Sequence, residues 1–319
     1  MFILIFLVIN VCANDNYQRL SFMHKQLSLV KPFQEAGSLL PFWDFHGSTI
    51  VTSQNIRLTP DIQSKKGALW SKVPVNTPHW ELELQFHVHG KGTSLYGDGF
   101  ALWYTKERMQ SGDVFGNKNG FSGLAIFFDT YSNYNGEHTH AHPFISAMVS
   151  NGSLLYDHDS DGTHTQLSGC HMPFRNKEKS TVLVRYAEDV LSVSMDPKGI
   201  GSWEECFISE GVVLPTKYYL GLTSATGELS DNHDVLALRF YELESMTEES
   251  PAKDYSLRAD RVPSAAHYEV PREHVPESPP TRMRTILIYI VVLIGVGIII
   301  FIGYLYIKDR EQKRNKRFY

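Results

Sequence analysis

The sequence predicts an all-β fold, a two-sheet sandwich of jelly-roll type in one domain, followed by a single C-terminal transmembrane helix. Short alternating or continuous apolar runs fill residues 27–244, and Gly, Asp and Asn separate them, which is typical of strands and turns. No stretch of that block shows ten or more residues of helical periodicity. A block of that length made of strands without helices favours a large sandwich.

Residues 1–13 have the character of a signal peptide. Residues 2–9 form an uninterrupted apolar run, and residues 11–13 end the segment with the small or modest side chains that signal peptidase accepts. We expect cleavage after Ala13, although the segment lacks the usual Lys or Arg at its start. A buried N-terminal strand is the alternative.

The domain that follows, which we place at residues 14–245, contains eight clear strand patterns: residues 80–89, 99–104, 123–129, 144–149, 181–186, 191–195, 218–223 and 235–243. Residues 80–86 alternate between apolar and polar side chains, as a strand with one packed face and one wet face would. Residues 124–128 are continuously apolar, as a strand covered on both faces would be.

The C-terminal part predicts a membrane anchor. Residues 246–284 contain six prolines and many charges without apolar periodicity, so we expect an extended lumenal stalk that does not pack. Residues 285–307 carry no charge, and a helix that rises about 1.5 Å per residue over that length would span the hydrocarbon core. Basic residues crowd the tail, residues 308–319, and orient it to the cytosol. This is the topology of a single-pass type I membrane protein.

The charge distribution excludes nucleic acid as a partner. The net charge is −5, and the last twelve residues hold six basic and two acidic side chains. The rest of the chain therefore carries 24 basic and 33 acidic residues, a net charge of −9. Binding to nucleic-acid phosphates requires a positively charged surface, and a part of the chain with this net negative charge does not supply one.

The cysteine content is consistent with a domain that lies in the lumen of the secretory pathway. Cys12 leaves with the signal peptide, so Cys170 and Cys206 remain as a pair in an oxidising compartment, where we expect one disulfide. Two free buried thiols are the alternative. Asn151 begins the tripeptide Asn-Gly-Ser, a sequon for N-glycosylation that fits lumenal exposure.

Two oxygen-rich loops follow apolar strands, at residues 129–133 and 157–162. Carboxylates, amides and carbonyls are the ligands that Ca²⁺ prefers, so these loops are candidates for a calcium site. The second loop matches the first half of an EF-hand loop but has Ser168 where that motif needs a bidentate Glu. A pair of Asp/Asn turns without metal is the alternative.

Several motifs in order and spacing resemble the L-type lectins of the animal secretory pathway. They lie at residues 97–104, 127–133, 151–158, 169–170 and 226–234. Within this family the chain resembles the vesicular integral-membrane branch, whose tails also end in Lys-Arg-Phe-Tyr, here Lys316, Arg317, Phe318 and Tyr319. The resemblance covers nearly the whole chain.

The resemblance implies a legume-lectin-like β-sandwich that binds mannose residues of high-mannose N-glycans through a calcium-organised loop, without enzymatic activity. It also implies a cargo receptor of the endoplasmic reticulum, the intermediate compartment and the Golgi. By position, the expected calcium ligands are Asp129, the carbonyl of Tyr131, Asn133 and Asp161. The expected sugar contacts are Ser64, Asp98, Asn133, His158, Gly227, Glu228 and Leu229. A cis peptide before Asp98 is a further expectation.

The tail adds a trafficking function to this interpretation. Twelve cytosolic residues are too few to fold, so we expect them to act as a peptide signal. The basic residues before Phe318 and Tyr319 resemble a retrieval signal read by the retrograde coat, and the aromatic pair resembles an export signal read by the forward coat. Vesicle coat proteins are therefore expected partners.

Two positions depart from the family pattern. The vesicular lectins have Gly-Asp-Leu where this chain has Glu228 in the middle position, and the extra methylene leaves the preference among glycan arms open. The run from Glu137 to His142 is the second departure. His138, His140 and His142 at period two would share a strand face and could ligate Zn²⁺, but a solvated loop is the simpler interpretation.

Two other classes of function compete with the lectin. A glycoside hydrolase on the same fold would need two carboxylates, and Glu81 with Glu83 share one strand face, although alternation favours a wet face there. A membrane-anchored adhesion or structural sandwich without sugar specificity is the other alternative. The clustered Asp, Asn and His residues of the loops favour the lectin.

Overall fold

The computed structural model of the chain describes residues 17–35, 38–133, 140–245 and 258–265, together with Gly295, Gly297, Phe301, Gly303 and Lys308. The chain divides into two units, residues 1–268 and residues 269–319. The first unit is a β-sandwich, which confirms the predicted fold class. In the second unit the five described residues are helical.

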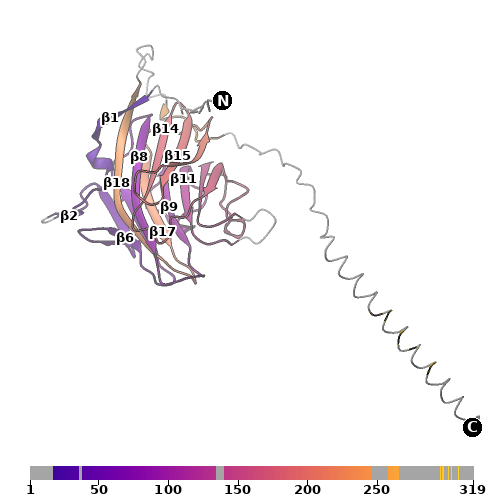
Figure 1. Cartoon of the computed structure of the whole chain (residues 1–319). Coiled ribbons are helices and arrows are strands. Elements are labelled where there is room, and N and C mark those ends of the chain that lie inside the picture. Colours follow the sequence, from indigo (N-terminus) through magenta and orange to yellow (C-terminus); the bar gives the residue numbers. More distant parts are fainter. Residues whose placement is uncertain are drawn as a thin grey trace, which may run out of the picture. The chain divides into compact units, whose positions relative to one another are not determined.

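One layer of the sandwich is an antiparallel eight-stranded sheet (Figure 1). Its strands are β1 (Tyr17–Met23), β5 (Ile50–Val51), β6 (Ile56–Thr59), β8 (Trp80–His89), β14 (Ser180–Ala187), β15 (Val190–Asp196), β16 (Glu204–Ser209) and β18 (Asn232–Ser245). Their order is β16-β15-β14-β8-β18-β6-β5, and β1 also pairs with β18.

The other layer is an antiparallel seven-stranded sheet. Its strands are β4 (Trp43–Gly47), β7 (Lys66–Ser71), β9 (Gly99–Thr105), β11 (Ser122–Asp129), β12 (Phe144–Asn151), β13 (Ser168–His171) and β17 (Tyr219–Ala225), in the order β13-β12-β11-β9-β17-β7-β4. The remaining elements are the small pair β2 (Gln34–Glu35) and β3 (Ser38–Leu39), strand β10 (Ser111–Val114), and the 3-10 turns η1 (Lys25–Leu27) and η2 (His158–Ser160). All eight predicted strands are present within three residues at either end.

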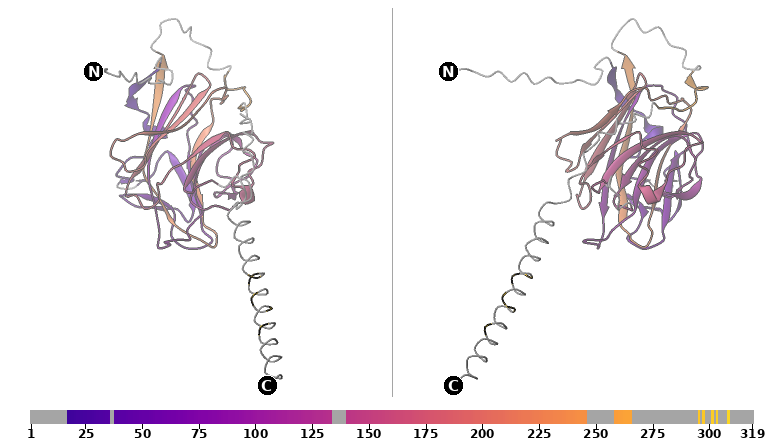
Figure 2. Two further views of the ribbon diagram at one scale, coloured as in Figure 1. Left: turned by 45° about the vertical axis from the view of Figure 1, so that its right-hand side comes forward. Right: turned by 90° about the vertical axis from the view of Figure 1, so that its right-hand side faces the viewer.

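The main core lies between the two sheets, which face each other in Figure 2. Alternate residues of β8, including Leu82, Leu84 and Phe86, point inward and are at most 1% exposed. They meet the inward residues of the facing sheet, such as Phe100 and Phe128, whose rings stack at 4.3 Å. Burial of each such side chain contributes roughly 1.5–3 kcal/mol, so the sandwich is held mainly by this layer.

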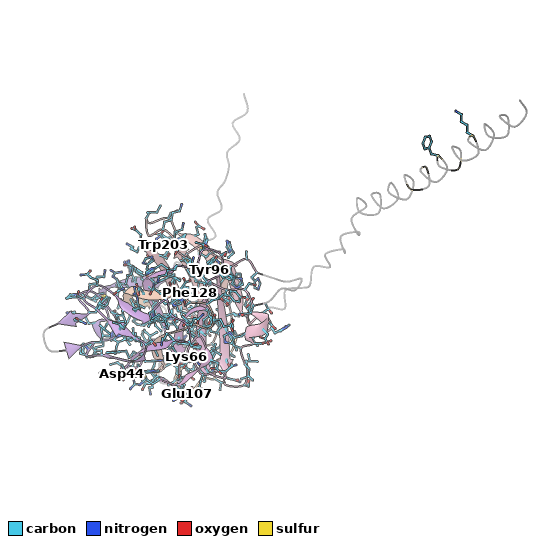
Figure 3. All side chains as sticks on the ribbon, turned by 90° about the horizontal axis from the view of Figure 1, so that it is seen from below. Asp44, Lys66, Tyr96, Glu107, Phe128 and Trp203 are labelled. Atoms are coloured by element: carbon cyan, nitrogen blue, oxygen red, sulfur yellow. A yellow bond between two sulfur atoms is a disulfide. The ribbon has the colours of Figure 1, made fainter. Side chains whose placement is uncertain are left out.

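The seven-stranded sheet is covered on both faces, as the continuous apolar run predicts. Leu124, Ile126 and Phe128 of β11 face the main core, whereas Ala125 and Phe127 belong to a second core cluster on the outer face. That cluster also contains loop residues such as Phe115 and Tyr156, so loops close over this face. Figure 3 shows the dense side-chain packing, with Phe128 labelled within the body and the half-exposed Trp203 near its edge.

The burial of β8 alternates as predicted from Leu82 to His89, with partly exposed polar residues between buried ones, but Glu81 departs from the pattern. Glu81 is only 5% exposed and forms ion pairs with Arg19 and Arg185, at 3.3 and 3.2 Å. Glu83 pairs with Arg239 at 2.8 Å. Glu81 is buried because the neighbouring strand places Arg185 opposite it, and Glu83, which faces Arg239, is partly exposed.

Residues 258–265 pack onto the first unit, although they lie in the stretch predicted as an unpacked stalk. Arg258 and Pro263 are buried, and Ser264 forms a β-bridge with Val213. Arg261 pairs with Asp189 at 3.1 Å. The expectation is therefore wrong for these eight residues, because their contacts are with positions about fifty and seventy residues earlier in the chain, which composition cannot reveal.

The membrane anchor remains a prediction. Among the described residues, no helix is long and apolar enough to cross a membrane. The signal peptide at residues 1–13, most of residues 285–307 and the tail beyond Lys308 lie outside the described residues.

The predicted disulfide is present and joins the two sheets. Cys170 lies on β13 of the seven-stranded sheet and Cys206 on β16 of the eight-stranded sheet. Both side chains pack against the main core. The bond therefore ties together the edge strands of the two layers.

We expect replacement of both cysteines by Ser to lower the free energy of unfolding by about 3–4 kcal/mol, because the bond closes a loop with a sequence separation of 36. Thermal unfolding should show a midpoint lower by roughly 10 °C. The matched control is the wild-type chain in reductant, which should fall to the same midpoint. Equal midpoints for the oxidised wild type and the variant would show that the bond does not stabilise the fold.

Candidate functional site

Loops at one end of strands β9, β11 and β17, in the seven-stranded sheet, form a pocket of about 250 Å³. Gly99 at the start of β9 pairs with Asp129 at the end of β11 and with Ala225 at the end of β17. Because these ends meet, the loops at residues 97–98, 130–133 and 226–231 converge there. The pocket is lined by Asp98, Asp113, Phe115, Asp129, Asn133 and His158, four of which the sequence analysis predicts.

Two buried carboxylates hold the loop at residues 130–133. Asp129 is 5% exposed, and its Oδ1 accepts a hydrogen bond of 2.9 Å from the backbone N–H of Tyr131. Asp161 is equally buried, and its Oδ1 accepts 2.9 and 3.2 Å bonds from the backbone N–H and the side-chain amide of Asn133. All four predicted calcium ligands therefore come together in one loop cluster.

The electrostatics of this cluster favour a cation. Burial raises the pKa of Asp129 well above its ordinary range, and the charges of Asp161 and Asp98 raise it further, against the hydrogen bond from Tyr131. Buried carboxylates so close to one another disfavour the ionised state unless a positive charge compensates. The donor set consists of carboxylate, amide and carbonyl oxygens, which fits Ca²⁺.

His142 adds a nitrogen to this cluster that the sequence analysis missed. Its Nε2 lies 3.9 Å from Asp129 Oδ2, and its side chain is only 7% exposed. One potential ligand atom from each of Asp129, His142 and Asp161 lies within 4.8 Å of the others. Burial lowers the pKa of His142, which keeps the imidazole neutral.

The expectation of a solvated histidine loop is therefore wrong for His142. The register of β11 and β12 explains the difference, because Phe144 pairs with Asp129 and residues just before Phe144 must lie beside it. His140 instead stacks its ring on Phe144 at 4.1 Å, so the two histidines do not converge on one metal. His138 lies outside the described residues. No local sequence signal places His142 there, because its position depends on the register of the β11–β12 hairpin.

Asp98 lies at the opposite wall of the pocket. The Gly97–Asp98 peptide is cis, as the sequence analysis expects. The backbone carbonyl of Asp98 accepts a 3.0 Å bond from the N–H of Thr130, and the Asp98 carboxylate accepts one from the N–H of Gly227. Burial raises the pKa of Asp98, whereas His158 and the Gly227 N–H lower it. A Cβ at Gly227 would lie 3.2 Å from Asp98 Oδ2, so glycine permits this approach.

The loop that contains Glu228 is fixed through its backbone. The N–H of Ser64 donates to the carbonyl of Gly227 at 3.1 Å, and Gln63 Nε2 donates to the carbonyl of Glu228 at 2.7 Å. Leu229 lies beside Gly97, where an added Cβ would be 3.5 Å from the Cβ of Leu229. Of the predicted sugar contacts, Asp98, Asn133 and His158 line the pocket. Ser64, Gly227, Glu228 and Leu229 lie in two adjoining loops, one of which contacts Gly97 and Asp98, and do not line it, and the Glu228 side chain is exposed.

His158 is held by two residues that the sequence analysis did not identify. Its Nε2–H donates to the carbonyl of Asp113 at 2.8 Å, and its ring lies 5.7 Å from that of Phe115. Asp113 lies in β10 and Phe115 directly follows that strand, and Phe115 packs on Phe127 at 5.2 Å. No local motif marks them, since only this packing brings them to the pocket.

An ion pair behind the pocket locks two of its loops together. Arg175 donates to both oxygens of the fully buried Asp231 at 2.8 and 2.7 Å, and to the carbonyl of Gly92 at 2.8 Å. Its guanidinium also lies 3.7 Å above the ring of Tyr96. The loop at residues 91–97 is therefore fixed to the loop at residues 226–231 before any ligand binds.

The other predicted sites lie outside the pocket. Asn151 is exposed at the end of β12, and its Oδ1 accepts hydrogen bonds from the backbone and hydroxyl of Ser153, at 3.0 and 2.6 Å. Glu81 and Glu83 do not line the pocket, and their ion pairs with arginines occupy the carboxylates that a hydrolase would need.

Comparison with known proteins identifies relatives along most of the chain. The model of the family described as the legume-like lectin family matches residues 21–250. The vesicular integral-membrane protein VIP36 of Canis lupus familiaris is 43% identical over 308 residues, which cover 93% of this chain and 85% of that protein. The VIP36-like protein of Mus musculus is 44% identical over 306 residues, 95% of this chain and 87% of that protein.

A solved structure with the same fold carries both metal and sugar. The exoplasmic/lumenal domain of VIP36 in its Ca²⁺/Man2-bound form superposes with a TM-score of 0.71 at 45% identity. The match covers 76% of this chain and 97% of that domain. The family resemblance drawn from the sequence motifs is confirmed.

We expect Ca²⁺ at about a hundredfold its dissociation constant to stabilise the domain by about 2.7 kcal/mol, which raises the thermal midpoint by roughly 5–10 °C. Asp129→Asn and Asp161→Asn should abolish the rise. Asp113→Asn is the matched control, because this exposed residue lines the same pocket without belonging to the ligand set, and it should keep the rise. An unchanged midpoint of the wild type in Ca²⁺ and in chelator would contradict the metal site.

The same measurement has a predicted pH dependence. The raised pKa of Asp129 means that the metal-free fold takes up a proton there, so acidification stabilises the metal-free fold relative to the unfolded chain. Protons and Ca²⁺ compete for that carboxylate, so the calcium-induced rise should shrink between about pH 7.5 and about pH 5.5.

Proposed function

The chain belongs to the legume-like lectin family, and on that premise we propose that it is a calcium-dependent receptor for mannose residues of high-mannose N-glycans on cargo glycoproteins. As a member of a lectin family it binds sugar and is not an enzyme. The observation that carries the proposal is the pocket in which the oxygen-rich loop of Asn133 meets Asp98 and His158.

Calcium is the cofactor of this site, held by Asp129, Asp161, the Tyr131 carbonyl and Asn133. When bound, it supplies positive charge to the two buried carboxylates and fixes the Asn133 amide in place. A side chain that is ordered before the ligand arrives spares the binding reaction the entropy of ordering it. That saving matters for a small hexose, which offers little area for contact.

The polar groups around the pocket suit the hydroxyls of a hexose. The Asp98 carboxylate can accept hydrogen bonds from two vicinal hydroxyls, and the Asn133 amide can donate one to a hydroxyl oxygen. The backbone at Gly227, Glu228 and Leu229, with Ser64, closes the other side. Because Glu228 is exposed and held only through its carbonyl, its side chain is placed to influence which glycan arm binds rather than whether mannose binds.

We infer that this site lies in the lumen of the secretory pathway. We assign residues 1–13 to a signal peptide, residues 246–284 to the connection to the membrane, residues 285–307 to the transmembrane helix and residues 308–319 to a cytoplasmic tail that binds coat proteins. The disulfide between Cys170 and Cys206 and the exposed sequon at Asn151 support lumenal exposure of the domain, with N-glycosylation at Asn151. The relationship to vesicular integral-membrane proteins supports residence between the endoplasmic reticulum and the Golgi.

Asp98→Asn should abolish binding of a mannose-rich oligosaccharide, because the amide replaces one acceptor oxygen with a donor and removes the negative charge that strengthens the hydrogen bonds from the hydroxyls. Calorimetry with the full chain in detergent, in Ca²⁺ and in chelator, measures this. Asp159→Asn is the matched control, since that side chain precedes the loop of Asp161 without lining the pocket, and it should bind as the wild type does. Lack of binding by the wild type in Ca²⁺ would favour the adhesion module instead.

Replacement of Phe318 and Tyr319 by Ala should shift the chain toward the endoplasmic reticulum, because the export signal is lost while the basic retrieval signal remains. Fluorescence microscopy of the tagged chain measures the distribution. Replacement of Lys316 and Arg317 by Ala is the complementary variant and should shift it forward to the Golgi. An unchanged distribution in the first variant would remove the export function from the tail.

A further inference from the structure

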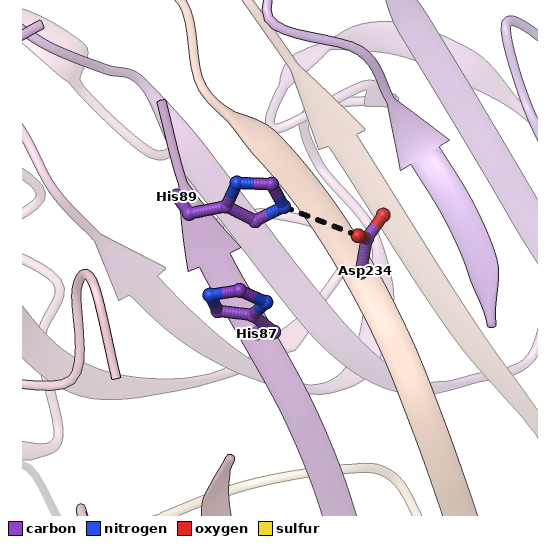
Figure 4. Close-up of side chains that lie close together, drawn as sticks. All are labelled: His87, His89 and Asp234. Carbon is purple, nitrogen blue, oxygen red and sulfur yellow. Dashed lines mark hydrogen bonds and ion pairs between the residues drawn. The ribbon is translucent and has the colours of Figure 1, made fainter. Parts of the chain in front are cut away.

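We propose that the chain carries a second metal site, for a transition metal ion such as Zn²⁺, formed by His87, His89 and Asp234 on the outer face of the eight-stranded sheet (Figure 4). These residues share nothing with the calcium cluster, which lies on the other sheet. The site goes beyond the lectin function and does not depend on it.

Strand geometry brings the three side chains together. His87 and His89 are two residues apart on β8, so both point to the same face of the sheet, and Asp234 on β18 is the direct cross-strand partner of His87. Figure 4 shows the two imidazoles side by side on one strand with the carboxylate facing them from the next. Ligand atoms from all three lie within 4.8 Å of one another.

The distances approach those of a tetrahedral zinc centre. Ligands about 2.0–2.1 Å from the metal in a tetrahedron lie roughly 3.3 Å from each other. His89 Nε2 lies 3.3 Å from Asp234 Oδ2. The His87 and His89 rings stack 4.0 Å apart with 19° between their planes. The His87 ring must therefore rotate to turn a nitrogen toward an ion beside His89 and Asp234, which completes three ligands and leaves a fourth position for water.

The donor chemistry selects a transition metal over calcium. Two imidazoles and one carboxylate are ligands typical of Zn²⁺, Cu²⁺ or Ni²⁺, whereas Ca²⁺ requires six to eight oxygens. Burial lowers the pKa of His87, with the neighbouring His89 as the next cause. A neutral imidazole is the form that binds metal.

Arg57 orients the carboxylate of this site. Its Nε and Nη2 each donate to one oxygen of Asp234 at 2.7 Å, and the Asp234 side chain is only 4% exposed. Metal-ligating carboxylates are commonly held by such a hydrogen bond from a second residue. The positive charge of Arg57 opposes the metal and predicts a modest affinity, so the ion would exchange with the surrounding solution.

A plain hydrogen-bonded pair is the competing explanation. The bond between His89 and Asp234, supported by Arg57, accounts for one histidine and requires no metal. It does not account for His87, for which the structure gives no hydrogen bond to Asp234 and whose ring stacks on that of His89. A shared metal would use both imidazoles, and a titration with Zn²⁺ separates the two explanations.

The test is calorimetric titration of the full chain in detergent with ZnCl₂, in excess Ca²⁺ so that the calcium site is filled. The wild type should take up one Zn²⁺ per chain at this site. His87→Gln combined with His89→Gln should weaken that binding by at least about tenfold, because two of three ligands are lost. The single change His87→Gln should also weaken it, and it leaves the contacts of Arg57, His89 and Asp234 in place.

The control is His46→Gln combined with His164→Gln, which removes two histidines elsewhere on the sandwich and should bind Zn²⁺ as the wild type does. The calcium-induced rise in thermal midpoint reports that each variant is folded. The proposal is wrong if the wild type takes up no Zn²⁺ in excess Ca²⁺. It is equally wrong if zinc uptake survives in both His87 variants but is lost in His142→Gln, since the ion would then occupy the calcium cluster.

Discussion

The ligand site depends on one electrostatic constraint, the burial of Asp129 and Asp161 in the same cluster. Two carboxylates in a poorly solvated site repel each other, and neither hydrogen bonds nor burial removes that repulsion. The loop at residues 130–133 is bound to both through backbone and amide N–H groups, so its conformation follows from theirs. A cation that neutralises the pair therefore also fixes Asn133, and metal binding and sugar binding become parts of one event.

The seven-stranded sheet makes this arrangement possible because it is packed on both faces. The residues on its inner face belong to the main core. The residues on its outer face, such as Trp103 and Phe127, pack against loop residues such as Phe115 and Tyr156. These loops are held in place by apolar contacts with the outer face of the sheet, and they do not contribute side chains to the interior of the sandwich. The pocket can therefore be polar while its supports are apolar, and Arg175 with Asp231 adds a rigid connection behind it.

The outer face of the eight-stranded sheet differs from that of the seven-stranded sheet, because it is polar. Charged and polar side chains along β8 alternate with core residues, and arginines on adjacent strands neutralise the carboxylates. This face stays polar yet is partly covered, and at the end of β8 nearest the ligand loops the same pattern brings His87, His89 and Asp234 together. Each sheet thus carries its own cluster of metal-binding side chains, oxygen-rich on one and nitrogen-rich on the other.

The sequence by itself determined the strands, the disulfide partners and most of the site, because alternation, cysteine number and motif order are local properties that can be read without a fold. The oxygen-rich loops of Asn133 and Asp161 were identified from composition, whereas the roles of Asp98, Asn133, His158 and Asp161 came from the resemblance to a lectin family. Only the tertiary structure decided that Glu81 is buried under arginines, that His142 lies beside Asp129, that Asp113 and Phe115 line the pocket, and that residues 258–265 pack. Each of these depends on strand register or on contacts between distant segments, and burial and charge pairing are properties of such contacts, not of local composition.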